Sequence, residues 1–261
     1  MVTVRAGAAS DAGRVRQLNE DTALTTTGMF VVADGMGGHA AGEVASGLAV
    51  ARLGRLGARG DLKPDDVRAE LALANRDILA SAGEHPERAG MGTTVAGLSL
   101  VRFAGTEHWV VFNVGDSRVY RFVEDTLVQM TVDHSEVEEL VAAGAIDSEQ
   151  ARTHPRRNVV TRALGMDPAP DPDVWVFPPT PGERFLICSD GLSLELADAE
   201  IAAVLRAEPT PQEAAEALVR KAVDAGGRDN VTVVVVDHVT GDDDEANADT
   251  LPRAGRTEPG Q

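Results

Sequence analysis

One repeated pattern most constrains the fold of this chain: an aspartate at the junction between an apolar run and a glycine-containing turn. The pattern occurs at Phe30–Ala33 with Asp34-Gly35, at Val110–Val114 with Gly115-Asp116, at Phe185–Ser189 with Asp190-Gly191, and at Gly226-Gly227-Arg228-Asp229 ahead of the run from Val231. Short apolar runs of this kind are typical of buried β-strands bounded by turns. The sequence therefore predicts rigid strand ends that each present an acidic side chain.

Two interpretations apply to these aspartates. Asp and Gly often mark turns for conformational reasons alone, and any single Asp-Gly pair is more often a turn than a ligand. Several carboxylates gathered at one edge would repel one another strongly, unless a hard divalent cation such as Mg²⁺ or Mn²⁺ lay among their oxygens. The fourfold recurrence favours a metal site.

A further polar segment lies near the N-terminus, over residues 13–21. It places Arg14 and Arg16 beside Glu20 and Asp21, with little apolar content. One interpretation is a solvated loop with surface ion pairs. The other is an arginine that grips a phosphate through its planar fork, next to acids that hold metal-bound waters.

The order of the elements predicts the fold class. Strands are expected at 30–33, 95–103, 109–114, 119–123, 184–188 and 231–236, and helices at 40–57, 64–81, 136–143 and 214–223. Several strands follow one another directly and the helices come in pairs, which favours a mixed α+β sandwich over a parallel doubly wound sheet.

Composition limits the setting of the protein. The 261 residues include 24 Lys and Arg against 42 Asp and Glu, a formal net charge of −18, which argues against nucleic-acid binding. Cys188 is the single cysteine, so an intrachain disulfide is excluded and a reducing compartment is favoured. We find no signal-peptide pattern and no apolar run of membrane-spanning length, so we expect a cytoplasmic, membrane-free monomer.

From about residue 240 the composition changes. Asp242-Asp243-Asp244-Glu245 is followed by residues of low hydrophobicity, which is typical of a disordered acidic tail. The expected domain organisation is therefore a folded domain over 1–239 and a tail over 240–261.

Eight segments in register resemble the metal-dependent protein phosphatases of the protein phosphatase 2C type, in their bacterial form. They are RVRQLNED at 14–21, VVADGMGGHAAGEVAS at 31–46, GTTVAG at 92–97, NVGDSRVYR at 113–121, DHS at 133–135, HPRRNVVTRALG at 154–165, LICSDGLS at 186–193 and GGRDNVTVVVV at 226–236. The resemblance implies an antiparallel β-sandwich flanked by helix pairs, in the order α-β-β-α.

The resemblance also implies a centre with two Mn²⁺ or Mg²⁺ ions and a weaker third site. By position, the implied metal ligands are Asp34 as the bridging carboxylate, the Gly35 carbonyl, Asp190, Asp229, Asp116 for the third site and Glu20, with Asp21 holding metal-bound water. In such a centre a metal-bridging hydroxide attacks phosphorus directly, without a phosphoenzyme.

The remaining implied roles concern the phosphate and the leaving group. Arg16 corresponds to the phosphate-binding arginine, and His39 to the general acid that protonates the leaving alkoxide. The segment at about 133–153 corresponds to a flap over the site; His134 and His154 are interpreted as structural or flap residues.

One position departs from the family pattern. Leu194 stands where relatives often carry an aspartate of the third site, so that site is in question while the two-metal centre is expected to persist. The neighbouring Glu195 would point elsewhere on a regular element. Cys188 is not expected to be a phosphatase nucleophile. A cysteine-dependent phosphatase needs an arginine six residues after its cysteine, and that position is Leu194 here. We therefore expect Cys188 to be a buried strand residue.

Two functions are consistent with these residues. The first is a protein phosphatase that acts on phosphoserine and phosphothreonine in phosphorylated proteins, among them a Ser/Thr kinase or its targets. The second, motivated by Leu194, is a weakly active metal-binding regulatory module that binds phosphoproteins.

Overall fold

The computed structural model describes residues 2–37, 41–59 and 61–239. Its strands are β1 (Thr3–Asp11), β2 (Thr22–Thr25), β3 (Met29–Ala33), β4 (Gly35–Met36), β5 (Gly92–Thr93), β6 (Val95–Phe103), β7 (Thr106–Val114), β8 (Arg118–Val123), β9 (Thr126–Gln129), β10 (Asp173–Phe177), β11 (Arg184–Cys188) and β12 (Val231–Val239). Its helices are α1 (Gly42–Gly57), α2 (Pro64–Glu84), the 3₁₀ turn η1 (Pro86–Arg88), α3 (Glu136–Ala142), α4 (Ser148–Thr153), α5 (Asp190–Glu195), α6 (Asp198–Ala207) and α7 (Pro211–Ala225).

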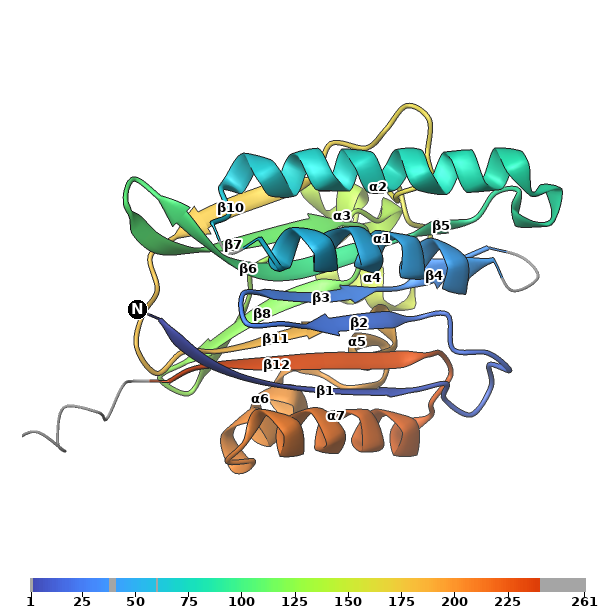
Figure 1. Ribbon diagram of the computed structural model, residues 1–261. Helices are drawn as coiled ribbons and strands as arrows, with labels where there is room; N and C mark the ends of the chain where they lie inside the picture. The colour runs from blue at the N-terminus through green and yellow to red at the C-terminus, as the bar shows by residue number, and fades with distance from the viewer. Residues whose placement is uncertain (1, 38–40, 60, 240–261) are drawn as a thin grey trace, which may run out of the picture.

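Two antiparallel five-stranded sheets form the centre of the fold. One has the order β1-β12-β11-β8-β9 and the other β10-β7-β6-β3-β2, with β4 and β5 as a separate small pair. Helices α1 and α2 cover the outer face of the second sheet, and α6 and α7 cover the first (Figure 1). The expected α+β class and the helix-flanked antiparallel sandwich are confirmed.

Strand alternation explains this layering. In β3, Phe30 and Val32 face the other sheet, while Val31 packs toward α1 and α2. In β11, Ile187 faces the other sheet, while Cys188 packs toward the helices of its own side. Because both faces of the central strands are buried, their sequences are continuous apolar runs rather than alternating ones.

The burial of Cys188 confirms the interpretation of that residue. Its side chain is fully buried, and burial raises the pKa of the thiol to about 12. A thiol in this environment is a packing group and not a nucleophile.

The predicted elements are present with shifted ends. All six expected strands are found, and α7 extends three residues before and two after its predicted range. Residue 40, where the first helix was expected to begin, lies outside the described residues, and so does the expected acidic tail at 240–261. Across the described ranges, no helix has both the length and the apolar character that a membrane span requires.

Strand β1 was not predicted, because its sequence has few large apolar residues. It pairs with β12 along its whole length, from Thr3 opposite Val239 to Asp11 opposite Val231. A Cβ at Gly7 would collide with the backbone of Gln212 in α7, so the small residues of β1 permit close helix packing.

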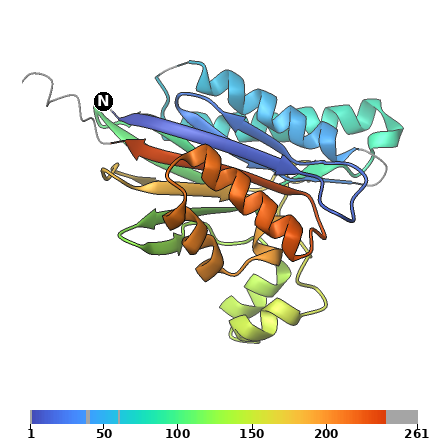
Figure 2. The same cartoon turned by 90° about the horizontal axis from the view of Figure 1, so that it is seen from below.

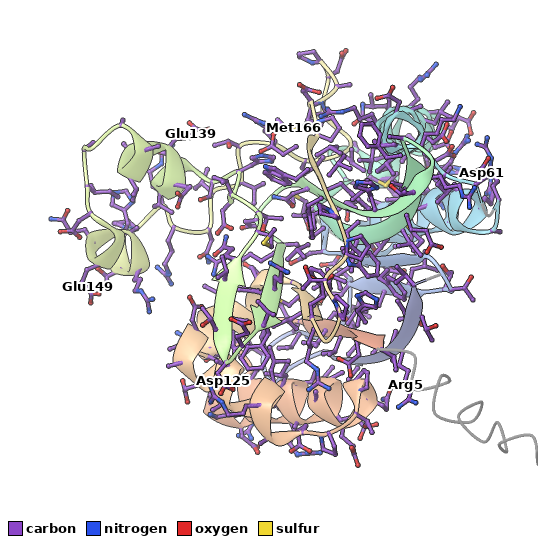
Figure 3. All side chains as sticks on the ribbon, turned by 90° about the vertical axis from the view of Figure 1, so that its left-hand side faces the viewer. Arg5, Asp61, Asp125, Glu139, Glu149 and Met166 are labelled. Carbon is purple, nitrogen blue, oxygen red and sulfur yellow. The ribbon has the colours of Figure 1, made fainter. Side chains whose placement is uncertain are left out.

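Helices α3 and α4 stand apart from the sandwich. Figure 2 shows them as a yellow-green unit projecting to one side, and in Figure 3 their residues Glu139 and Glu149 lie away from the two helix layers. This unit occupies the segment expected to be a flap.

Candidate active site

The strand ends that carry aspartate meet at one end of the sandwich. The loop from β1 to β2, the end of β3 and the start of β12 lie together at the right-hand end in Figure 1. Asp190 is the first residue of α5, separated by one residue from the end of β11, which pairs with β12. The sequence pattern therefore brings its carboxylates to a common region.

Asp34 has a tightly held backbone. Its carbonyl accepts hydrogen bonds from the Thr94 amide (2.9 Å) and the Thr93 hydroxyl (2.9 Å), and its amide donates to the Thr94 hydroxyl (3.2 Å). At the next position a Cβ would collide with the Gly42 backbone at the start of α1, so only glycine fits at Gly35. The Asp34-Gly35 peptide is thus wedged between β5 and α1.

The pKa values of the aspartates at this end of the sandwich are set mainly by desolvation and by mutual repulsion. Desolvation, followed by the charges of neighbouring aspartates, raises the pKa values of Asp34 and Asp190 well above the ordinary range. Desolvation also raises the pKa of Asp21 to about 6, with an added effect of the Asp229 charge. Each aspartate thus responds to the charges of the others, and such a group favours either protons or a cation.

Within the described residues, no three Asp, Glu, His or Cys side chains already form a closed metal-binding set. Both carboxylate oxygens of Asp229 are engaged in other contacts. One of its carboxylate oxygens accepts from the Asn230 amide (2.9 Å) and the other pairs with Arg16 (2.7 Å). Gly35 would contribute a backbone carbonyl, which lies outside any such side-chain set.

The same region nevertheless contains an oxygen that lacks a partner. Asp21 Oδ2 accepts a hydrogen bond from the Ser189 hydroxyl (2.8 Å), whereas Asp21 Oδ1 is buried with no hydrogen-bond partner among the described residues. A buried carboxylate oxygen is costly unless something binds it. An all-oxygen donor set with an orphaned carboxylate oxygen fits a hard divalent cation and water bound to it.

Arg16 and Glu20 occupy the loop between β1 and β2. The Arg16 side chain is 52% exposed and pairs with Asp229 through one terminal nitrogen, so much of its fork faces solvent. Glu20 accepts a hydrogen bond from the Gly42 amide (3.1 Å) through Oε1, which ties the loop to the first turn of α1.

Asp116 lies in the turn after β7, and the turn is bonded to the base of the α3–α4 unit. Desolvation, followed by the Asp133 charge, raises the Asp116 pKa to about 6. The Gly115 amide donates to His134 Nδ1 (3.1 Å), and the His134 amide donates to the Gly115 carbonyl (2.9 Å). His134 thus has a structural role in joining these segments.

Leu194 and Glu195 lie at the end of α5. Leu194 contributes only its carbonyl, which accepts from Arg228 (3.2 Å). Glu195 points to the same arginine, with bonds of 2.8 and 3.0 Å to its guanidinium and 3.0 Å to its amide. The expectation that Glu195 points elsewhere is met, and the pair joins α5 to the turn that carries Asp229.

His39, the expected general acid, lies outside the described residues. The sequence did not identify four residues that position the aspartates, although each lies in a segment that carries the family resemblance: Thr93, Thr94, Ser189 and Asn230. In the sequence these residues stand out only because they lie next to an aspartate or to the strand that pairs with it. That position does not show which group each side chain binds.

Comparison with known proteins places the chain in a family. The family model described as protein phosphatase 2C matches residues 14–224. The chain belongs to the protein phosphatase 2C family. It is 39% identical to the serine/threonine protein phosphatase PstP of Mycobacterium tuberculosis over 98% of its own length and 52% of that protein. It is 36% identical to the serine/threonine phosphatase stp of Listeria monocytogenes, over 87% and 93% respectively.

A solved structure supports the family assignment. The crystal structure of the PstP catalytic domain in complex with two manganese ions matches with a TM-score of 0.83 and 38% identity, covering 92% of this chain and all of that one. The chain spans about half the length of PstP and most of the Listeria protein.

Proposed function

We propose that this member of the protein phosphatase 2C family is a metal-dependent phosphatase that hydrolyses phosphoserine and phosphothreonine in proteins. The observation that carries the proposal is a group of aspartates with raised pKa values beside a solvent-facing arginine, Arg16. The names of PstP and the Listeria relative, and the two manganese ions of the PstP structure, support the same activity and cofactor.

Each side chain receives a role in this proposal. Asp34, the Gly35 carbonyl, Asp190, Asp229 and Glu20 would hold two divalent cations, and Asp116 would belong to a weaker third site. Asp21 would orient metal-bound water through its unpartnered oxygen. When bound, the cations lower the pKa of water and offset charge on the phosphoryl oxygens.

Arg16 then binds the phosphoryl group. Its planar guanidinium matches two phosphate oxygens, and its partial exposure lets a protein substrate reach it. Because the protein forms no covalent bond to the substrate in this reaction, its residues act mainly by orienting the phosphoryl group and neutralising its charge. We assign the α3–α4 segment as the flap beside this site and kinases or their targets as the source of substrates.

We expect the purified chain to hydrolyse a phosphothreonine peptide when Mn²⁺ is supplied, and to stop when a chelator is added. The measurement is phosphate release across separate Mn²⁺ and Mg²⁺ titrations. No release in either titration would contradict the proposed activity.

The leucine at position 194 motivates a second candidate, a weakly active module that binds metal and phosphoproteins. We expect Leu194→Asp to change the turnover rate by less than about tenfold, because the residues assigned to two cations are all present. A rate increase of several orders of magnitude in the same Mn²⁺ assay would instead favour the module.

A further inference from the structure

Asn230 makes an unusual set of contacts beside the candidate metal ligands. It follows Asp229 directly and is only 6% exposed. Its Nδ2 donates to the carbonyls of Ala12 (3.0 Å) and Leu18 (2.9 Å), and its Oδ1 accepts from the Glu20 amide (2.9 Å). One side chain therefore binds three backbone groups spread along a single loop.

This loop, residues 12–20, is held by polar contacts rather than by apolar burial. It contains neither helix nor strand, and its apolar side chains Val15 and Leu18 are 66% and 48% exposed, so they do not anchor it by burial. Near one end the Arg14 amide donates to the Gly227 carbonyl (2.7 Å) and the Arg14 guanidinium pairs with Asp224 (2.8 Å). Near the other end, Asn19 donates to Ser10 (2.8 Å) and Glu20 is bonded to the start of α1. Asn230 adds three bonds to the loop backbone, and the Arg16–Asp229 ion pair lies between them.

Asn230 also contacts the third part of the site. A Cβ at Gly191 would collide with the Asn230 carbonyl, so α5 begins in direct contact with this residue. Asp190 precedes that glycine. Asn230 is therefore adjacent to Asp229, packed against the start of α5 and bonded to the loop that carries Arg16.

We propose that Asn230 is a positioning residue that sets the phosphate-binding arginine against the carboxylates of the metal centre. The inference rests on the proposed function, because it takes Arg16 as the phosphate ligand. An amide is suited to this role, since it offers donors and an acceptor at once and adds no charge beside Asp229. Misplacement of such a group by about 1 Å can cost about 100-fold in rate.

The test uses Asn230→Ala in the full chain, with inorganic phosphate as the probe. We expect phosphate to inhibit the Mn²⁺-loaded variant about 10- to 100-fold more weakly. In an Arg16→Ala background the same change should have almost no further effect, because the group being positioned is gone. Equal weakening in both backgrounds would overturn the positioning role.

Hydrogen exchange gives a second measurement that does not depend on activity. The amides of residues 12–20 should exchange faster in metal-free Asn230→Ala, and unchanged exchange there would contradict the inference. If this variant does not fold, Asn230→Asp is used, because it retains the acceptor for the Glu20 amide and loses both donors.

Asn75 provides a matched control. It is 2% exposed, donates to the Met166 carbonyl (3.1 Å) and accepts from the Gly165 amide (2.6 Å), so it too binds a loop backbone. Asn75→Ala should lower thermal stability without weakening phosphate inhibition; equal weakening would overturn the inference. Failure of the unaltered chain to hydrolyse phosphopeptide would contradict the proposed function, whereas loop exchange in Asn230→Ala tests the positioning role separately.

Discussion

Asp34→Asn should abolish turnover and, in the absence of metal, raise the melting temperature. Activity should fall by about 10³-fold or more, because bound cations supply several kcal/mol of transition-state stabilisation and the assigned bridging carboxylate is lost. Stability should rise because burial and four neighbouring aspartates raise the Asp34 pKa, which means that its charge is unfavourable in the folded state. The measurements are phosphopeptide hydrolysis with Mn²⁺ and thermal unfolding with chelator.

The shape of the site favours an unchanged fold in this variant. Asparagine has nearly the size of aspartate, and the backbone at position 34 is held by Thr93 and Thr94 rather than by its own side chain. A lower melting temperature with chelator would contradict the predicted repulsion. Retained Mn²⁺-dependent activity would contradict the bridging role.

Asp77→Asn is the matched control, since the environment of Asp77 has the opposite electrostatic sign. Hydrogen bonding to Arg52 lowers the Asp77 pKa, with bonds of 2.6 and 3.0 Å. We therefore expect a slight loss of stability and unchanged activity. The pair of variants separates the effect of a carboxylate repelled by its neighbours from that of a surface ion pair.

The sequence predicted the parts of the fold that depend on local pattern. The central strands are buried on both faces, so their apolar runs are visible without the structure, and Asp34 and Asp190 follow such runs directly. Strand β1 could not be predicted because its packing comes from pairing with β12 and from small residues against α7. That information is tertiary and not local.

The candidate site, like the fold, combines residues that local sequence predicts with contacts that only the tertiary structure reveals. Aspartates at strand ends and the resemblance together predict the acidic residues and Arg16 of the candidate site. The bonding of Asn230 to a loop more than 200 residues earlier, and the orphaned oxygen of Asp21, depend on which loops meet in space. No spacing within the sequence reports such a contact.

Metal-free protein should lose stability as the pH rises from about 4 through 6 and beyond. The pKa of Asp21 is raised from 3.8 to about 6, and the pKa of Asp116 is raised to the same value. Between these values the folded state binds protons that the unfolded state has released, so unfolding becomes easier as pH rises. Each group contributes a destabilisation on the order of 3 kcal/mol above its folded pKa, and the higher pKa values of Asp34 and Asp190 extend the decline.

Mn²⁺ should make this decline shallower, because binding to the carboxylates requires the charged forms and releases the protons. At 100 times its dissociation constant the ion would add about 2.7 kcal/mol to the stability of the folded state. Urea unfolding at pH 5, 6, 7 and 8, with chelator and with Mn²⁺, measures both effects. A metal-free stability that is flat or rises over this range would contradict the coupled acidic centre, while Asp34→Asn should show a shallower decline because it removes one of the repelling charges.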